Sequence, residues 1–140
     1  MEERRRVVRQ LLRALTCASA ALTLTLPSGA AQACELPPGI RVESDRVAAT
    51  YRTIPASIAI GKPFVLELAA CPKRGGAISE RIRLDAHMPE HRHGMNYRTK
   101  VVSVGPGRFH SEGWLFHMPG RWEFVFDLGA ERLTHSVRIE

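Results

Sequence analysis

The chain has 140 residues, enough for a single domain, and 44% of them are hydrophobic, as in ordinary globular proteins. Its formal net charge is +6, but residues 1–33 hold five arginines and two glutamates, so residues 34–140 carry only +3. No cluster of basic residues interleaved with aromatic residues occurs in that part, which argues against a nucleic-acid-binding protein. Solubility explains the remaining positive charge.

The first 33 residues have the composition of a secretory signal peptide. Five arginines precede a mostly apolar run at residues 14–26, and Ala31-Gln32-Ala33 supplies the small residues of a cleavage site. A transmembrane anchor would need about 20 apolar residues, and this run is shorter and interrupted by threonine and serine. We therefore predict cleavage after Ala33 and a periplasmic or secreted protein. The arginine run is also weakly similar to a twin-arginine signal.

If the protein is exported, its cysteines are expected to be oxidised. Cys17 leaves with the signal peptide, and Cys34 and Cys71 remain as an even pair, which in an oxidising compartment favours a disulfide. That bond would close a loop of about 37 residues and stabilise the fold by roughly 4 kcal/mol. Two alternatives stay open. One is a lipid anchor on Cys34, although Ala31 stands where lipoprotein signals usually have leucine, and the other is a thiolate copper ligand at Cys71.

The chain after residue 33 begins with a lead-in segment, residues 34–47, which holds two prolines, a glycine and several charges. Over residues 48–140, short apolar stretches alternate with turn residues, and no stretch keeps a helical period. The predicted strands lie at residues 51–54, 64–70, 82–88, 97–104, 108–112, 114–118, 122–126 and 133–139. This spacing of about 8–12 residues predicts an all-β domain at 48–140, an antiparallel sandwich of seven to eight strands.

The clearest alternation lies at residues 82–88, directly before Pro89. Apolar residues occupy the even positions and polar residues the odd ones, which predicts a half-buried strand. The inward residues would be Ile82, Leu84, Ala86 and Met88, and the outward ones Arg83, Asp85 and His87. Proline cannot donate to a strand ladder, so the strand should end at Pro89.

Methionine and histidine are concentrated in two short segments, residues 87–95 and 116–120. These hold all three methionines other than Met1, and four of the six histidines. Thioether sulfur is a soft ligand and imidazole a borderline one, and together they favour Cu(I) over magnesium or calcium. We therefore predict a copper site.

The predicted primary ligands are His91, His93 and Met95. Residues i and i+2 of an extended segment share a face, so both imidazoles could approach one ion. Gly94 can take a positive φ, which would turn the chain back and bring Met95 to the site. The candidates for completing the shell are Met88, His117 and Met118, while Glu90 or water could complete a Cu(II) site.

Other interpretations of these residues stay open. Met88 and Met118 continue the inward faces of apolar strands, so each can be a core residue. In a regular strand, His87 and His117 would face away from the adjoining methionine. Zinc is the rival metal, which would use the histidines and leave Met95 idle. His110 and His135 stand alone, and we assign them no role.

Three motifs resemble the YtkA-like domain, a family of small exported or membrane-tethered bacterial proteins. They are Met-Pro-Glu-His-Arg-His-Gly-Met at residues 88–95, Gly-Pro-Gly-Arg-Phe at 105–109, and Phe-His-Met-Pro-Gly-Arg-Trp-Glu at 116–123. They occur in the family's order, and the resemblance covers residues 60–140. The family is related to the FixH-type accessory proteins of copper-containing respiratory oxidases.

The resemblance implies an immunoglobulin-like sandwich and a role near copper, because the family pattern admits His or Met at the positions of His91, His93 and Met95. The chain departs from the family in Cys34 and Cys71. It also lacks the long membrane helix of the FixH-type relatives, which argues against direct tethering to an oxidase.

The leading hypothesis is a non-catalytic copper-binding protein for copper delivery or resistance, whose partner beyond the ion would be a copper enzyme or another envelope protein. The alternative is a metal-free interaction module that binds an envelope protein through its sandwich surface. An enzyme is disfavoured, because the chain has no Gly-x-Ser-x-Gly, no His-Glu-x-x-His and no blue-copper cysteine loop.

Overall fold

The structure, a computed structural model, describes residues 34–140. The predicted signal peptide and its cleavage site lie outside the described residues. Within residues 34–140, no helix is long and apolar enough to cross a membrane.

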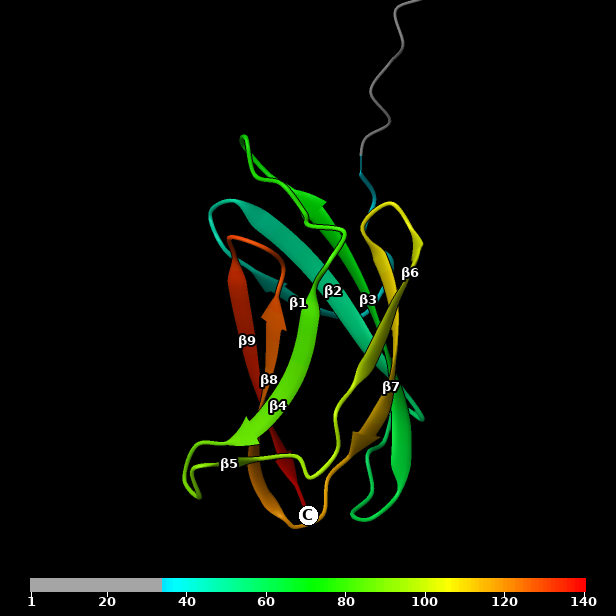
Figure 1. Ribbon diagram of the computed structural model, residues 1–140, viewed down its shortest axis with the longest axis vertical. Helices are drawn as coiled ribbons and strands as arrows, with labels where there is room; N and C mark the ends of the chain where they lie inside the picture. The colour runs from blue at the N-terminus through cyan, green and yellow to red at the C-terminus, as the bar shows by residue number, and fades with distance from the viewer. Residues whose placement is uncertain (1–33) are drawn as a thin grey trace, which may run out of the picture. The chain divides into compact units, whose positions relative to one another are not determined.

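Nine strands form two antiparallel sheets that pack face to face (Figure 1). The strands are β1 (Ile40–Glu43), β2 (Val47–Ile54), β3 (Pro63–Pro72), β4 (Arg83–Met88), β5 (His93–Gly94), β6 (Lys100–Gly105), β7 (Arg108–Leu115), β8 (Gly120–Asp127) and β9 (Arg132–Ile139). One sheet has the order β1-β2-β3-β7-β6 and the other the order β5-β4-β8-β9. Apart from β1, these are the A-B-E-D and C′-C-F-G sheets of an immunoglobulin domain, so the predicted fold class is confirmed.

Two of the nine strands, β1 and β5, were not predicted. The predicted strands at residues 108–112 and 114–118 are one continuous strand, β7, and residues 116–118 lie outside it. β1 lies inside the predicted lead-in segment, and of its four residues only Val42 is buried. β5 has two residues and lies inside the predicted loop. The strand predicted from Tyr97 begins instead at Lys100, and Tyr97 is 56% exposed. On β4 the alternation holds, since Leu84, Ala86 and Met88 are buried as expected. Ile82, also predicted to lie inward, precedes the strand and is only partly buried.

Aromatic side chains from both sheets fill the space between them. The ring of Tyr51 on β2 lies 5.3 Å from that of Phe124 on β8. Phe64 on β3 lies 5.2 Å from Phe116, and Trp114 on β7 lies 5.4 Å from Phe124. Tilted and edge-to-face pairs at these distances add attraction to the burial of apolar surface. Phe124 contacts rings from β2, β3 and β7, so it joins the two sheets.

The polar ends of the aromatic core residues have partners. The indole Nε1–H of Trp114 donates to the hydroxyl of Ser111 at 2.9 Å. The hydroxyl of Tyr51 lies 2.6 Å from Nδ1 of His135 on the opposite sheet. Burial raises the pKa of Tyr51 far above its ordinary value, so this hydroxyl stays protonated and can donate.

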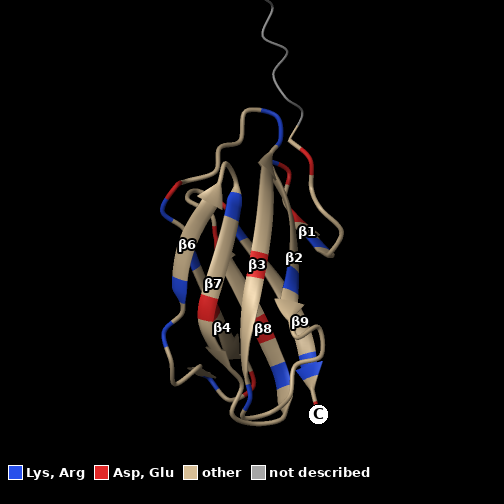
Figure 2. Cartoon of the chain, turned by 90° about the vertical axis from the view of Figure 1, so that its right-hand side faces the viewer, with Lys and Arg blue, Asp and Glu red and all other residues tan. Residues whose placement is uncertain are grey.

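A disulfide between Cys34 and Cys71 ties the N-terminal segment to β3, which confirms the predicted pairing. The bond uses both thiols, so no thiolate ligand exists at Cys71. On the five-stranded sheet, basic and acidic residues are interspersed along the strands (Figure 2).

Candidate metal site

A tight hairpin between β4 and β5 positions His91 and His93. The backbone N–H groups of His91 and Arg92 both donate to the carbonyl of Met88, at 3.2 and 2.9 Å. The chain reverses at Arg92, whose φ is 55°. The prediction that residues 91–93 are extended, with a positive φ at Gly94, is therefore wrong. Gly94 lies in β5 and pairs with β4, while the left-handed residue that the turn requires is Arg92.

His93 lies on the inward side of the sheet. It pairs with Met88 in the β4–β5 ladder, and directly opposite residues of antiparallel strands share a face. Its ring centroid lies 6.1 Å from that of the buried Trp122. The hairpin thus places a partly exposed imidazole at the end of the core.

The connection between β7 and β8 brings His117 to the same end of the sandwich, where β5 and this connection both lie at the bottom of Figure 1. β7 ends at Leu115, so the parity rule that would point His117 outward no longer applies. Two hydrogen bonds hold the connection: Gly61 N–H donates to Phe116 O at 2.8 Å, and Trp122 Nε1–H donates to Met118 O at 3.0 Å.

Three imidazoles lie in a row at this end. The ring centroid of His93 is 5.9 Å from that of His91 and 5.2 Å from that of His117. With nitrogen–metal bonds of about 2 Å, two imidazoles on a tetrahedral ion have centroids roughly 5 Å apart. The His93–His117 separation therefore matches a two-histidine site. The His91–His93 separation is slightly wider.

The hydrogen bonds of these rings show which nitrogens are available. Nδ1 of His93 lies 3.0 Å from the carbonyl of Gly94. A carbonyl only accepts, so Nδ1 carries the proton and Nε2 of the neutral ring has a free lone pair. Metal-binding histidines commonly have this arrangement, with one nitrogen donating to a backbone carbonyl. Nδ1 of His117 is buried and has no hydrogen-bond partner.

The side chains are not arranged as a finished metal site. Across residues 34–140, no three His, Cys, Asp or Glu side chains converge so as to hold an ion. A three-histidine site would require His91, which is exposed on the turn, to rotate toward His93. The described residues provide a pair of adjacent imidazoles, His93 and His117, with the imidazole of His91 next to His93.

The three methionines differ in burial. Met88 is fully buried, and a Cβ at Gly120 would lie 2.7 Å from its Cε. Met88 therefore fills the core beneath the β7–β8 connection. Met95 and Met118 are partly buried and pack against the edge of the core. These two thioethers are the more accessible ones.

Carboxylates near the histidines have other partners. Glu90 pairs with Arg121 at 3.2 Å. His87 lies next to Glu123 at 3.5 Å on the outer face of the four-stranded sheet, away from the inward-facing His93. These carboxylates therefore have partners of their own, and the soft donors closest in sequence to the pair are the thioethers of Met95 and Met118.

The sequence predicted Trp122 only as a core residue. Its ring stacks on Phe116 at 4.3 Å, and its centroid is 5.4 Å from that of His117. Trp122 is therefore also the wall against which both histidines pack. Its alternation with Phe124 predicted that it points inward, but nothing in the sequence predicted which histidines it would meet.

Comparisons with family models, with curated proteins and with solved structures find no match to this chain. The resemblance to the YtkA-like domain therefore stays a prediction.

Proposed function

We propose that this protein is an exported, non-catalytic copper-binding protein, in which His93 and His117 hold one Cu(I) ion. The observation that carries the proposal is the pair of adjacent imidazoles, one with a free Nε2 and the other with a buried, unpartnered Nδ1. A buried polar group without a partner costs about 1–3 kcal/mol, and a bound ion is a partner that would remove this cost.

The identity of the neighbouring donors supports copper rather than zinc. Cu(I) accepts thioether sulfur and needs few ligands, while zinc prefers four nitrogen, thiolate or carboxylate donors. Met118 follows His117 directly, Met95 lies two residues after His93, and both pack against the core, while Glu90 is engaged by Arg121. In the proposed site, one of these methionines or the exposed His91 supplies the third ligand. An exposed third ligand would also allow the ion to be exchanged, as delivery or resistance requires.

Competitive Cu(I) titration against a colorimetric chelator tests the proposal. The wild type should bind one equivalent, and the His93→Ala/His117→Ala variant should bind at least about tenfold more weakly. Met95→Leu and Met118→Leu should show which of the two thioethers contributes to Cu(I) affinity. Neither substitution should change the affinity for zinc. His110→Ala, on the outer face of the other sheet, is the matched control. Equal Cu(I) affinity in the double variant and the wild type would contradict the site and favour the metal-free interaction module.

A further inference from the structure

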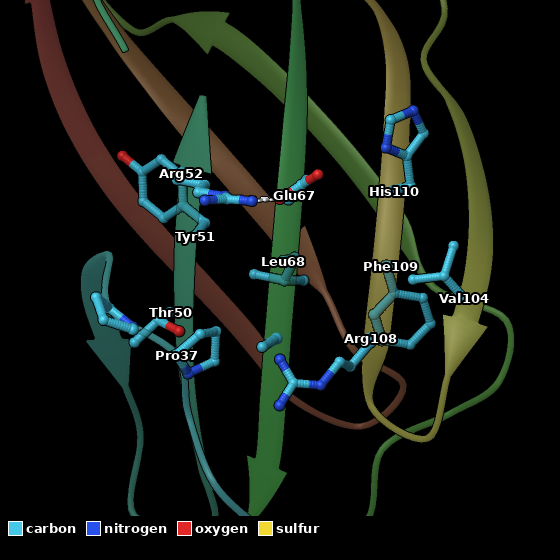
Figure 3. A pocket seen from close by; sticks show the side chains of 12 residues that line it. Pro37, Thr50, Tyr51, Arg52, Glu67, Leu68, Val104, Arg108, Phe109 and His110 are labelled. Atoms are coloured by element: carbon cyan, nitrogen blue, oxygen red, sulfur yellow. Dashed lines mark hydrogen bonds and ion pairs between the residues drawn. The ribbon is translucent and has the colours of Figure 1, made fainter. Parts of the chain in front are cut away.

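A groove of about 390 Å³ lies on the outer face of the five-stranded sheet (Figure 3). The N-terminal segment, residues 34–39, forms one wall with Pro37, and β6 forms the other with Val104. Glu67, Leu68 and Ala69 of β3 lie between them. Val104 is 65% exposed, which is unusual for a large apolar side chain. The volume lies within the range of pockets that hold small molecules.

The disulfide and two close contacts hold the wall in place. Cys34 is bonded to Cys71 at the end of β3, and the guanidinium of Arg108 donates to the carbonyl of Glu35 at 3.1 Å. The segment approaches β2 closely at Gly39, where a Cβ would lie 2.7 Å from the carbonyl oxygen of Tyr51. The groove therefore depends on a segment that the disulfide fastens to the sheet.

Two hydrogen-bond donors face each other across the groove. Strand register aligns Thr50, Ala69 and Arg108 in one row on β2, β3 and β7. Figure 3 shows the Arg108 side chain reaching over β3 toward Pro37 and Thr50. The small side chain of Ala69 leaves room between them.

Neither donor has an anionic partner. Thr50 is only 6% exposed, and its Oγ1 is one of the two buried side-chain N or O atoms of residues 34–140 without a partner. Arg108 contacts a neutral carbonyl and forms no salt bridge with a described residue. In the next row of the sheet, Arg52 pairs with Glu67 at 2.6 Å, so those two charges compensate each other. An unmatched positive charge therefore remains beside an unsatisfied hydroxyl.

We propose that this groove binds a small molecule with an apolar body and one carboxylate. The carboxylate would accept hydrogen bonds from Thr50 Oγ1 and from the Arg108 guanidinium, and charge-assisted bonds of this kind are stronger than neutral ones. The apolar body would cover Val104 and Pro37 and remove their surface from water. The site is independent of the histidine pair, because it lies on an outer face instead of at the end of the core.

Isothermal titration of the protein with octanoate and with phenylacetate tests the proposal. At least one of them should bind with one equivalent, while 1-octanol, which lacks the charge, and acetate, which lacks the apolar body, should bind at least about tenfold more weakly. Thr50→Val and Arg108→Gln should each lower the binding affinity for the carboxylate by about tenfold. Arg138→Gln, an exposed arginine on β9, is the matched control and should change nothing.

Two further measurements separate binding from folding. Without ligand, Thr50→Val should unfold at the same or higher urea concentration than the wild type, because it removes an unsatisfied hydroxyl at nearly constant volume. The Cys34→Ser/Cys71→Ser variant, if folded by circular dichroism, should lose carboxylate binding and keep Cu(I) binding. Failure of both octanoate and phenylacetate to bind the wild type, or unchanged affinity in Thr50→Val and Arg108→Gln, would overturn the proposal.

Discussion

The middle of the sandwich and its histidine end are both packed with aromatic side chains, but they differ in whether their buried polar atoms have hydrogen-bond partners. In the middle, the indole N–H of Trp114 is hydrogen-bonded to Ser111 and the hydroxyl of Tyr51 to His135. At the histidine end, Nδ1 of His117 is also buried but has no hydrogen-bond partner among residues 34–140. Folding alone explains the first region, because every buried group gains a partner. In the second region one buried nitrogen has no partner among residues 34–140, and the proposed copper ion would supply one.

The largest effect should come from the middle region. Phe124→Ala removes the ring that contacts Tyr51, Phe64 and Trp114, and large-to-small changes of this kind cost about 3–5 kcal/mol. Urea denaturation should show the loss as a lower midpoint. A cost below about 1 kcal/mol would mean that the two sheets are not held together by these rings.

The disulfide should rank next. Cys34→Ser/Cys71→Ser removes a bond between residues 37 positions apart in the sequence. The chain-entropy model predicts that the free energy of unfolding falls by roughly 4 kcal/mol, and measured losses are often smaller. Because residues 34–39 lie outside the two-sheet core, the variant should keep its β-sheet circular dichroism spectrum. Unchanged stability in oxidised and reduced protein would show that the bond does not constrain the unfolded chain.

His117→Leu should act in the opposite direction on stability. Replacing a buried imidazole that lacks a partner with an apolar side chain should stabilise the metal-free protein by about 1–3 kcal/mol. Adding Cu(I) should raise the midpoint of the wild type, because a ligand that binds only the folded state stabilises it, and should leave the variant unchanged. Denaturation with and without Cu(I) measures both effects. Destabilisation of the metal-free variant would mean that the imidazole has a partner in solution, such as ordered water.

The smallest effect should come from a surface ion pair far from both regions. Asp127 accepts hydrogen bonds from Arg132 at 2.6 Å and from Arg83 at 2.9 Å, and these hold the pKa of its carboxyl below the ordinary value. A lowered pKa stabilises the folded state above about pH 4 and loses this contribution as the pH falls through the folded pKa. Asp127→Asn should therefore cost up to about 1 kcal/mol near pH 7 and nothing in strong acid.

Urea denaturation as a function of pH checks that prediction. The two unfolding curves should converge as the pH falls, and a difference that persists in acid would assign the effect to packing rather than charge. Arg138→Gln on β9, whose side chain forms no ion pair with a described residue, serves as the control for a change of surface charge.

The sequence predicted the fold where alternation was strong. β4 and β8 are half-buried strands with aromatic or aliphatic inward faces, and their period is visible in the residues alone. β1 was missed because prolines and charges surround its single buried residue, Val42. β5 was missed because two residues are too few to show a period.

The sequence predicted the residues of the histidine end but not their arrangement. His91 and His93 were grouped from their spacing, whereas His117 joins them only because β7 ends two residues earlier. The carboxylate groove had no sequence signature at all. Thr50 and Arg108 become neighbours through strand register, which a single sequence does not state.

The most direct test of the copper site is nitrogen-15 NMR of the histidine rings during Cu(I) titration. Up to one equivalent, the ring nitrogens of His93 and His117 should shift, while those of His110 and His135 should stay constant. Unchanged His93 and His117 signals at one equivalent, or equal shifts in all six histidines, would contradict the account.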